Sequence, residues 1–245
     1  ILQSETNQNR WHVGLMGAYG HSKIDVSPVT DKLNNSGLAR NATAKLDGYI
    51  VGAYATWFGY DRNETGPYID TWAQHAWYKN KVQGNTLAEE KFDSTGWTAS
   101  VEGGYSFVGH DGATRQLIIE PQAQLAYNSY HADSLRESNG TEISGGNLDG
   151  VIGRAGVRFY SRNKENLNAI QPFVEANWLY SSAKNSLVFN GEALSEDTPK
   201  SRYELKLGLQ GNITKNLQLR GHVGGQYSGN GYNRYEGTVE AKYSF

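Results

Sequence analysis

The chain contains no cysteine and only five prolines among its 245 residues. Without cysteine it can form neither a disulfide framework nor a thiolate metal site. No stretch of 18 apolar residues occurs, which excludes a membrane-spanning helix. The formal net charge of −2 gives no reason to expect a nucleic acid as partner. Because the sequence also lacks a phosphate-binding glycine loop and a metal-spaced cluster, we expect no metal and no cofactor.

Glycine, tyrosine and tryptophan are abundant instead, at 29, 16 and 6 residues. This composition favours many twisted strands with aromatic ends. Apolar residues alternate with polar ones along most of the chain, and helical periodicity is nearly absent. The pattern predicts ten strands, at 9–21, 44–60, 66–80, 91–108, 115–130, 148–160, 168–181, 201–211, 216–227 and 233–245.

Within each predicted strand, a run of alternate residues is free of Asp, Glu, Lys and Arg, as at Trp97, Ala99, Val101, Gly103 and Tyr105. The last strand shows this plainly, since "RYEGTVEAKYSF" alternates apolar or aromatic groups with mostly charged ones and ends on Phe245. The charges of the other strands lie on the opposite face. Two folds fit this pattern, namely a soluble sandwich with a buried apolar face and a transmembrane barrel with that face in lipid.

The positions of the aromatic residues favour the barrel. Trp11 and Tyr19, eight residues apart, stand at the two ends of a short aliphatic run. Eight residues span about 26 Å of strand, or about 20 Å of depth at a tilt near 40°, close to the apolar band between two aromatic girdles. We expect these girdles to contain Trp11, Tyr19, Tyr49, Trp57, Trp77, Trp97, Tyr105 and Trp178.

Short and long connections alternate along the chain. Short ones follow the second, fourth, sixth and eighth predicted strands, while the long ones include 22–43, 81–90, 131–147 and 182–200. Short periplasmic turns and longer outside loops are typical of outer-membrane barrels. The sequence therefore predicts an all-β, antiparallel, up-and-down transmembrane barrel with both chain ends on the periplasmic side.

The polar face is then predicted to line a water-filled interior. Its acidic, amide and basic groups would make a hydrated, charge-balanced channel, although any water-filled barrel needs polar inward groups. The predicted lining residues are Glu102, Glu120, Gln122, Gln124, Arg154, Arg158, Glu175, Asn177 and Arg220.

Longer segments resemble one family closely. The runs "RWHVGLMGAYGHS", "GYIVGAYATWF", "DSTGWTASVEGGYSF", "QPFVEANW" and "YEGTVEAKYSF" are similar to the C-terminal translocator domain of AIDA-type autotransporters, in the same order and with similar spacing. The resemblance implies a monomeric barrel in the Gram-negative outer membrane, in contact with lipids and lipopolysaccharide. It also implies that the barrel helps to export its own N-terminal passenger.

The end of the chain resembles the signal that the outer-membrane assembly machinery reads in such barrels. This signal would comprise Phe245, Tyr243, Ala241 and Val239. The assembly machinery is therefore an expected partner of the chain.

One departure from the family concerns the number of strands. The family has twelve-stranded barrels, whereas ten strands are predicted here. "ILQSE" resembles the end of a strand already under way, so residues 1–245 would form a single domain that lacks the first two strands and the helix that plugs the interior. The alternatives are a genuine ten-stranded barrel, or a hairpin hidden in one of the long connections.

Three functions remain open at this point. The resemblance favours protein translocation without catalysis. A surface-loop protease or lipase is the second, and His131 and Asp133 in "YHAD" are its only candidates, at a spacing that is a weak signal. A diffusion porin is the third. Cleavage of the passenger inside the barrel would need an acid such as Glu102, Glu120 or Glu175.

Overall fold

The structure is a computed structural model that describes residues 2–6, 9–26, 42–59, 65–84, 87–166, 168–182, 186–195, 199–229 and 231–243. Every regular element in these residues is a β-strand. They contain no helix long and apolar enough to cross a membrane.

The ten predicted strands are all present, each with 11 to 18 residues. Their bounds are β2 (Asn9–Val26), β3 (Ala42–Phe58), β4 (Pro67–Gly84), β5 (Glu90–Tyr105), β7 (Arg115–Ala132), β10 (Gly150–Asn163), β11 (Gln171–Ser181), β14 (Ser201–Asn212), β15 (Leu217–Tyr227) and β16 (Asn233–Tyr243). The prediction of the main fold is confirmed. Strands β2 and β4 continue beyond their predicted ends, because their outward faces become charged there, at Lys23, Asp25 and Lys81, and the apolar stripe that marked these strands stops.

The predicted strand 91–108 is wrong at one point, because the chain breaks it at Ser106. The Ser106 amide donates to the Gly66 carbonyl at 2.9 Å, the last backbone contact that this segment makes with the neighbour on that side. Strand β4 begins at Pro67, so it offers no partner beyond this point. The next strand, β6 (Phe107–Asp111), pairs with β7 alone and contains a register shift between Val108 and His110.

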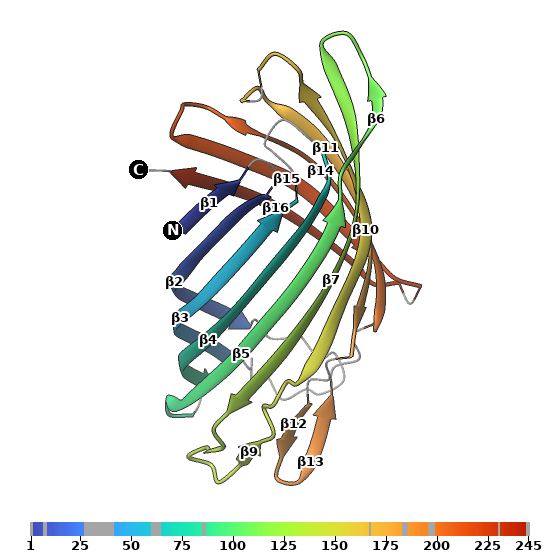
Figure 1. Cartoon of the computed structure of the whole chain (residues 1–245). Helices are drawn as coiled ribbons and strands as arrows, with labels where there is room; N and C mark the ends of the chain where they lie inside the picture. The colour runs from blue at the N-terminus through green and yellow to red at the C-terminus, as the bar shows by residue number, and fades with distance from the viewer. Residues whose placement is uncertain are drawn as a thin grey trace.

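Neighbouring strands in the sheet are neighbours in sequence, and all pairs are antiparallel. The order is β1-β2-β3-β4-β5-β7-β10-β11-β14-β15-β16, where β1 (Leu2–Thr6) confirms the expected strand end in "ILQSE". Figure 1 shows that the sheet curls strongly about its concave side. Among the described residues no backbone pairing joins β1 to β16, so the curled sheet is open there.

Two of the predicted long loops contain strands and fold together. They supply β8 (Leu135–Arg136), β9 (Glu142–Ser144), β12 (Ser186–Phe189) and β13 (Glu192–Ser195), which form a second sheet in the order β13-β12-β9-β8. The hairpin between β12 and β13 turns at Asn190 and Gly191, whose φ angles are 49° and 89°. Asn-Gly is the preferred pair for such a two-residue turn. One long connection therefore does hide a hairpin, but outside the main sheet.

Burial in the main sheet is the reverse of that in a soluble protein. On the outer face Leu15 is 88% exposed and Val223 is 63% exposed, whereas on the inner face Glu175 and Glu204 are 3% and 6% exposed. A soluble protein places its apolar side chains inside and its charges outside. The described residues contain no second layer over this apolar face, which matches a sheet whose outer solvent is hydrocarbon.

Candidate functional site

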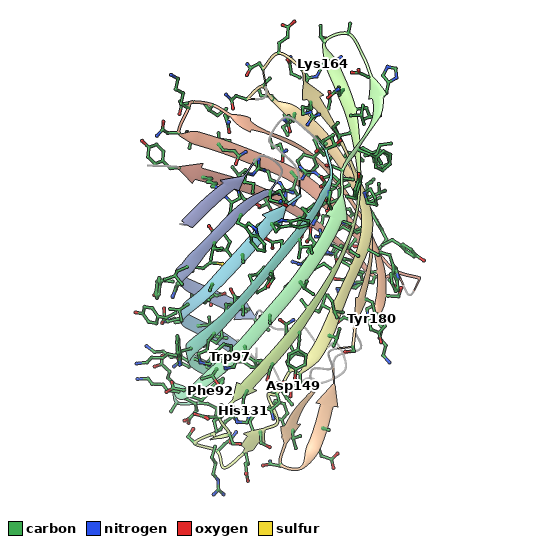
Figure 2. The ribbon with its side chains drawn as sticks, in the orientation of Figure 1. Phe92, Trp97, His131, Asp149, Lys164 and Tyr180 are labelled. Carbon is green, nitrogen blue, oxygen red and sulfur yellow. The ribbon has the colours of Figure 1, made fainter. Side chains whose placement is uncertain are left out.

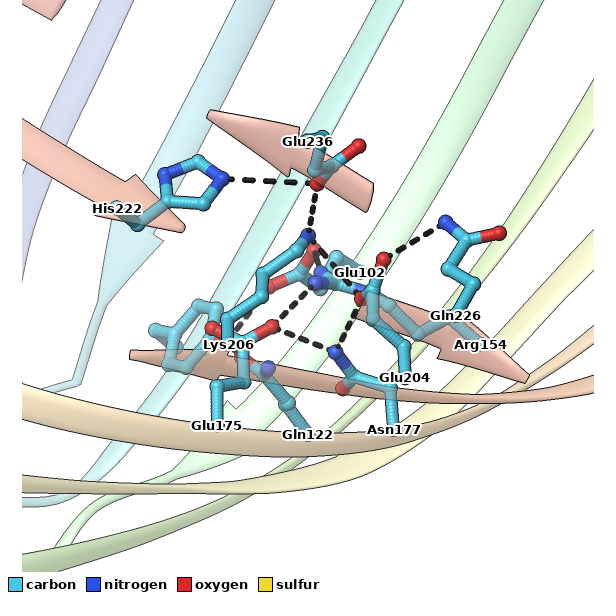
Figure 3. Close-up of polar contacts among 11 residues, drawn as sticks. Glu102, Gln122, Arg154, Glu175, Asn177, Glu204, Lys206, His222, Gln226 and Glu236 are labelled. Atoms are coloured by element: carbon cyan, nitrogen blue, oxygen red, sulfur yellow. Dashed lines mark hydrogen bonds and ion pairs between the residues drawn. The ribbon is translucent and has the colours of Figure 1, made fainter. Parts of the chain in front are cut away.

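The concave face of the sheet carries a network of hydrogen bonds and ion pairs that extends over eight strands (Figure 3). Strand alternation places its members, because residues of even number on β4, β5, β7, β10, β14, β15 and β16, and residues of odd number on β11, point inward. The side chains in the network are Tyr68, Glu102, Gln122, Arg154, Glu175, Asn177, Glu204, Lys206, His222, Gln226 and Glu236.

Arg154 on β10 is the centre of the first half of this network. Its Nη2 lies 2.5 Å from Glu102 Oε2, and its Nη1 lies 3.1 Å from Glu175 Oε1. The Tyr68 hydroxyl donates to the other oxygen of Glu102 at 2.7 Å. One guanidinium therefore contacts two carboxylates that come from strands on either side of it, and both carboxylates are largely shielded from solvent.

Glu204 on β14 is the centre of the second half. It accepts hydrogen bonds from Asn177 Nδ2 at 2.8 Å and from Gln226 Nε2 at 2.9 Å. Lys206 Nζ lies 3.1 Å from Glu204 and 3.7 Å from Glu236. Asn177 also donates to Glu175 at 2.8 Å, which joins the two halves into one continuous polar wall.

A second inward cluster combines arginines with aromatic rings. The guanidinium carbons of Arg158 and Arg220 lie 4.5 Å and 5.1 Å from the centre of the Phe173 ring. Arg158 Nη2 also donates to Gln210 Oε1 at 2.6 Å. The described carboxylates form no ion pair with Arg158 or Arg220. The cation–π contacts with the aromatic ring therefore stabilise these two cations.

A cavity of about 400 Å³ opens between the two clusters. Its wall is formed by Thr56, Phe58, Tyr68, Asp70, Glu102, Glu120, Gln122, Arg154, Arg158, Glu175 and Arg220. Nothing in the described residues groups histidine and carboxylate side chains in a way that could hold a metal ion.

Glycines on the inner face make room for aromatic rings from the neighbouring strand. Gly104 pairs with Tyr68, and a Cβ atom on Gly104 would lie 2.4 Å from the Tyr68 ring. Gly14 with Tyr54, Gly48 with Tyr78 and Gly208 with Phe173 repeat this arrangement. The rings therefore cover the glycines and bring the Tyr68 hydroxyl to the network.

We predict that Gly104→Ala lowers the free energy of unfolding by about 1–3 kcal/mol, because the added methyl group must displace the Tyr68 ring. The loss is expected to shrink when Tyr68 is also replaced by alanine, since the two changes share one contact. Gly237→Ala is the matched control, because a Cβ there meets nothing within 4 Å. Urea unfolding in lipid vesicles measures all four variants, and equal effects at Gly104 and Gly237 would contradict the prediction.

The nine predicted lining residues all lie on the concave side. Seven of them border the cavity, while Gln124 donates to the Ser100 hydroxyl at 2.9 Å and Asn177 belongs to the network. Sequence reasoning did not single out Tyr68, His222 or Gln226, and it placed Glu204, Lys206 and Glu236 on the polar face without including them among the lining residues. Strand parity was the signal that could have found them, because each has the same alternation as the residues that were named.

The predicted aromatic residues lie on the outer face, at positions that fit two rows. Tyr19, Tyr49 and Trp77 are direct cross-strand partners, and so are Trp11 and Trp57. Figure 2 shows Trp97 near the end of the sheet that carries the small second sheet. Tyr105 and Trp178 are exposed on the same outer face. Their role as membrane girdles stays a prediction.

The other candidate residues are placed differently. Val239, Ala241 and Tyr243 are exposed on β16, while Phe245 lies outside the described residues. His131 was expected in a loop, but it lies inside β7 opposite Thr95, because the strand continues to Ala132. No hydrogen bond or ion pair within the described part of the chain joins the side chains of His131 and Asp133. The loop-hydrolase hypothesis thus gains no support from geometry.

The chain resembles proteins of known class over almost its whole length. The Autotransporter beta-domain family matches residues 3–224. The uncharacterized protein YuaQ of Escherichia coli (strain K12) is 35% identical over 97% of the chain, and the autotransporter adhesin AIDA-I of Escherichia coli is 32% identical over 95% of it. The chain spans 18% of the length of each of these two relatives.

A solved structure supports the same assignment. The transport unit of the autotransporter AIDA-I from Escherichia coli superposes with a TM-score of 0.83 at 30% identity, covering 100% of this chain and 79% of that one. The match includes the curled sheet on which the polar network is built. The chain belongs to the autotransporter β-domain family, whose members are β-barrels of the Gram-negative outer membrane.

Proposed function

We propose that this chain is the membrane-embedded translocator of a secretion protein and that it helps to export a passenger polypeptide encoded N-terminal to it. The observation that carries the proposal is the burial of a wall of paired polar and charged side chains behind an apolar outer face. Relatives of the chain are much longer than the chain itself, and one of them is named an adhesin. An adhesin-type passenger is therefore the cargo we propose.

The interior suits an extended polypeptide for a physical reason. An apolar wall would adsorb the hydrophobic segments of a passing chain. Here each carboxylate of the network forms an ion pair with Arg154 or Lys206, so the wall offers no unpaired carboxylate in this network to hold the passenger. The translocator domain of this family is not itself catalytic, and we propose no catalytic step.

The arrangement of the connections supports an orientation. Among the described residues, the turns at 112–114 and 213–216 lie at one end of the sheet, and the longer segment 133–149 lies at the other. We propose that the short turns and both chain ends face the periplasm and that the longer segments face outward.

The open edge of the sheet bears on the single-domain prediction. Strands β1 and β16 each have one partner in the described residues, and unpaired backbone groups are costly in lipid. We propose that two further strands and a helix, encoded before residue 1, complete one monomeric barrel together with residues 1–245. Outer-membrane lipids, lipopolysaccharide and the assembly machinery are its proposed partners, and the machinery would read Val239, Ala241, Tyr243 and Phe245.

Protease accessibility of the complete gene product in Gram-negative cells tests the translocator function. Protease added outside the cells is expected to cut polypeptide that precedes residue 1, while the sheet stays protected. A passenger that remains intact outside and is cut only in lysed cells would contradict the proposal. Hydrolysis that is lost in His131→Ala or Asp133→Ala would favour the surface hydrolase instead, and a large steady conductance without any plug would favour the porin.

A further inference from the structure

Four lysines form a straight row across four neighbouring strands on the outer face. Lys23 on β2 pairs directly with Lys45 on β3, Lys45 with Lys81 on β4, and Lys81 with Lys91 on β5. Strands are about 4.8 Å apart, so the row is about 14 Å long. All four residues belong to the outward-facing alternation.

This row is unfavourable for the sheet by itself. Like charges directly opposite each other on neighbouring strands repel. At the two ends of the row, Lys23 Nζ lies 2.9 Å from Asp25 and Lys91 Nζ lies 3.6 Å from Glu89. These two ion pairs reduce the repulsion at the ends. For Lys45 and Lys81, in the middle, the described residues place no carboxylate within ion-pair distance. Within the described residues, Asp25 and Asp47 therefore act on Lys45 and Lys81 only over longer distances, and neither lysine forms an ion pair.

The carboxylate beside this centre already has other partners. Asp47 accepts a hydrogen bond from the Tyr19 hydroxyl at 2.8 Å and lies 2.7 Å from Nδ1 of His21. These hydrogen bonds lower the pKa of Asp47, which is therefore ionised at neutral pH. Two residues closer to the aromatic row, Lys79 pairs with Asp47 on one side and with Asp93 on the other. These two carboxylates therefore stand opposite Lys79 and not opposite a lysine of the four-lysine row.

The depth of the row matches a layer of lipid headgroups. Tyr19, Tyr49 and Trp77 form the aromatic row beneath it, and each stands four residues before or after the lysine of its own strand. Four residues correspond to about 13 Å of strand, or about 10 Å of height at a tilt near 40°. The flexible lysine stems can bend back toward the girdle and bring the ammonium groups to the phosphate level.

We propose that this lysine row, Lys23, Lys45, Lys81 and Lys91, binds the phosphate groups of an outer-leaflet glycolipid, lipopolysaccharide. The assignment to the outer leaflet rests on the orientation proposed above, because the row lies at the end of the sheet that carries the long connections. The acyl chains would lie against the apolar face below the aromatic row, and the phosphates would pair directly with Lys45 and Lys81.

Titration of the protein in detergent micelles with rough lipopolysaccharide tests the site. The double variant Lys45→Gln/Lys81→Gln is expected to bind about 10- to 30-fold more weakly than the wild type, since each lysine near a charged lipid surface contributes measurably to affinity. Lys215→Gln/Lys242→Gln removes the same charge at the opposite end of the sheet and should bind within twofold of the wild type. Equal affinity of wild type and the first variant would overturn the proposal.

The chemistry of the ligand is tested with the same variants. Dephosphorylated lipopolysaccharide should bind the wild type as weakly as the intact glycolipid binds Lys45→Gln/Lys81→Gln. Millimolar inorganic phosphate should not displace the glycolipid, and displacement would assign the row to a soluble anion instead. Without glycolipid, the first variant should melt at or above the wild-type temperature, because it removes like-charge repulsion.

A labelling experiment separates this proposal from the proposed function. Lys45→Cys should react with a membrane-impermeant thiol reagent in intact cells. Reaction only after the outer membrane is opened would contradict the orientation of the barrel and the outer-leaflet source of the lipid. The binding measured in micelles does not depend on orientation, so it tests the lysine row itself.

Discussion

Replacing Arg154 by methionine is expected to lower the free energy of unfolding by about 3–5 kcal/mol. The substitution leaves Glu102 and Glu175 without the cation that both contact, at 2.5 Å and 3.1 Å. The two side chains are 16% and 4% exposed, so water can replace the guanidinium only in part. Removing one partner of a buried ion pair costs more than removing the whole pair, because the other charge stays behind.

A combined variant distinguishes this cause from a simple loss of packing. When Arg154→Met is joined with Glu102→Gln and Glu175→Gln, no unpaired charge remains and most of the stability should return. Arg234→Met is the control, since Arg234 is exposed near the start of β16. Urea unfolding in lipid vesicles gives all these free energies. A loss that persists in the combined variant would show that the methylene stem of Arg154, and not its charge, is what the interior needs.

Most of the barrel could be predicted because hydrocarbon imposes a strict rule on sequence. Each strand that crosses it needs an uncharged outward face, and this requirement produced a readable alternation from Trp11 to Tyr243. The same rule located the inner residues by parity. The rule weakens where both faces meet water, which is why the ends of β2 and β4 and the strands β8 and β9 were not predicted.

The partners within the interior could not be predicted from parity alone. Parity indicates that Arg154 and Glu175 share a face, but not that Arg154 also reaches Glu102, two strands away in the order of the sheet. Arg154 and Glu102 both pair with Gln124 on β7, so that contact depends on the curvature of the sheet and on long side chains that reach across the strand between them. The turn at Asn190 and Gly191 differs, since its Asn-Gly pair is a local signal that could have predicted the β12–β13 hairpin.

Placing an arginine at the middle of the outer face is the second large effect we expect. Val101 lies on β5 halfway between Trp97 and Tyr105, and it is 50% exposed on the apolar side. A cation held at the bilayer midplane costs about 2–4 kcal/mol. Val101→Arg is therefore expected to destabilise the barrel by about that amount in lipid vesicles.

The matched control is Gln83→Arg, which also places an arginine on the outward alternation but near the end of β4, beyond the Trp77 row. Gln83 and Val101 are both exposed on the outer face, so the two positions differ chiefly in depth. The control is expected to change the free energy of unfolding by less than about 1 kcal/mol, because depth sets the cost. Urea titrations of both variants in vesicles measure the difference. Equal losses at the two positions would mean that hydrocarbon does not cover the middle of this face, since only a solvent that changes with depth can separate two exposed positions on the same face.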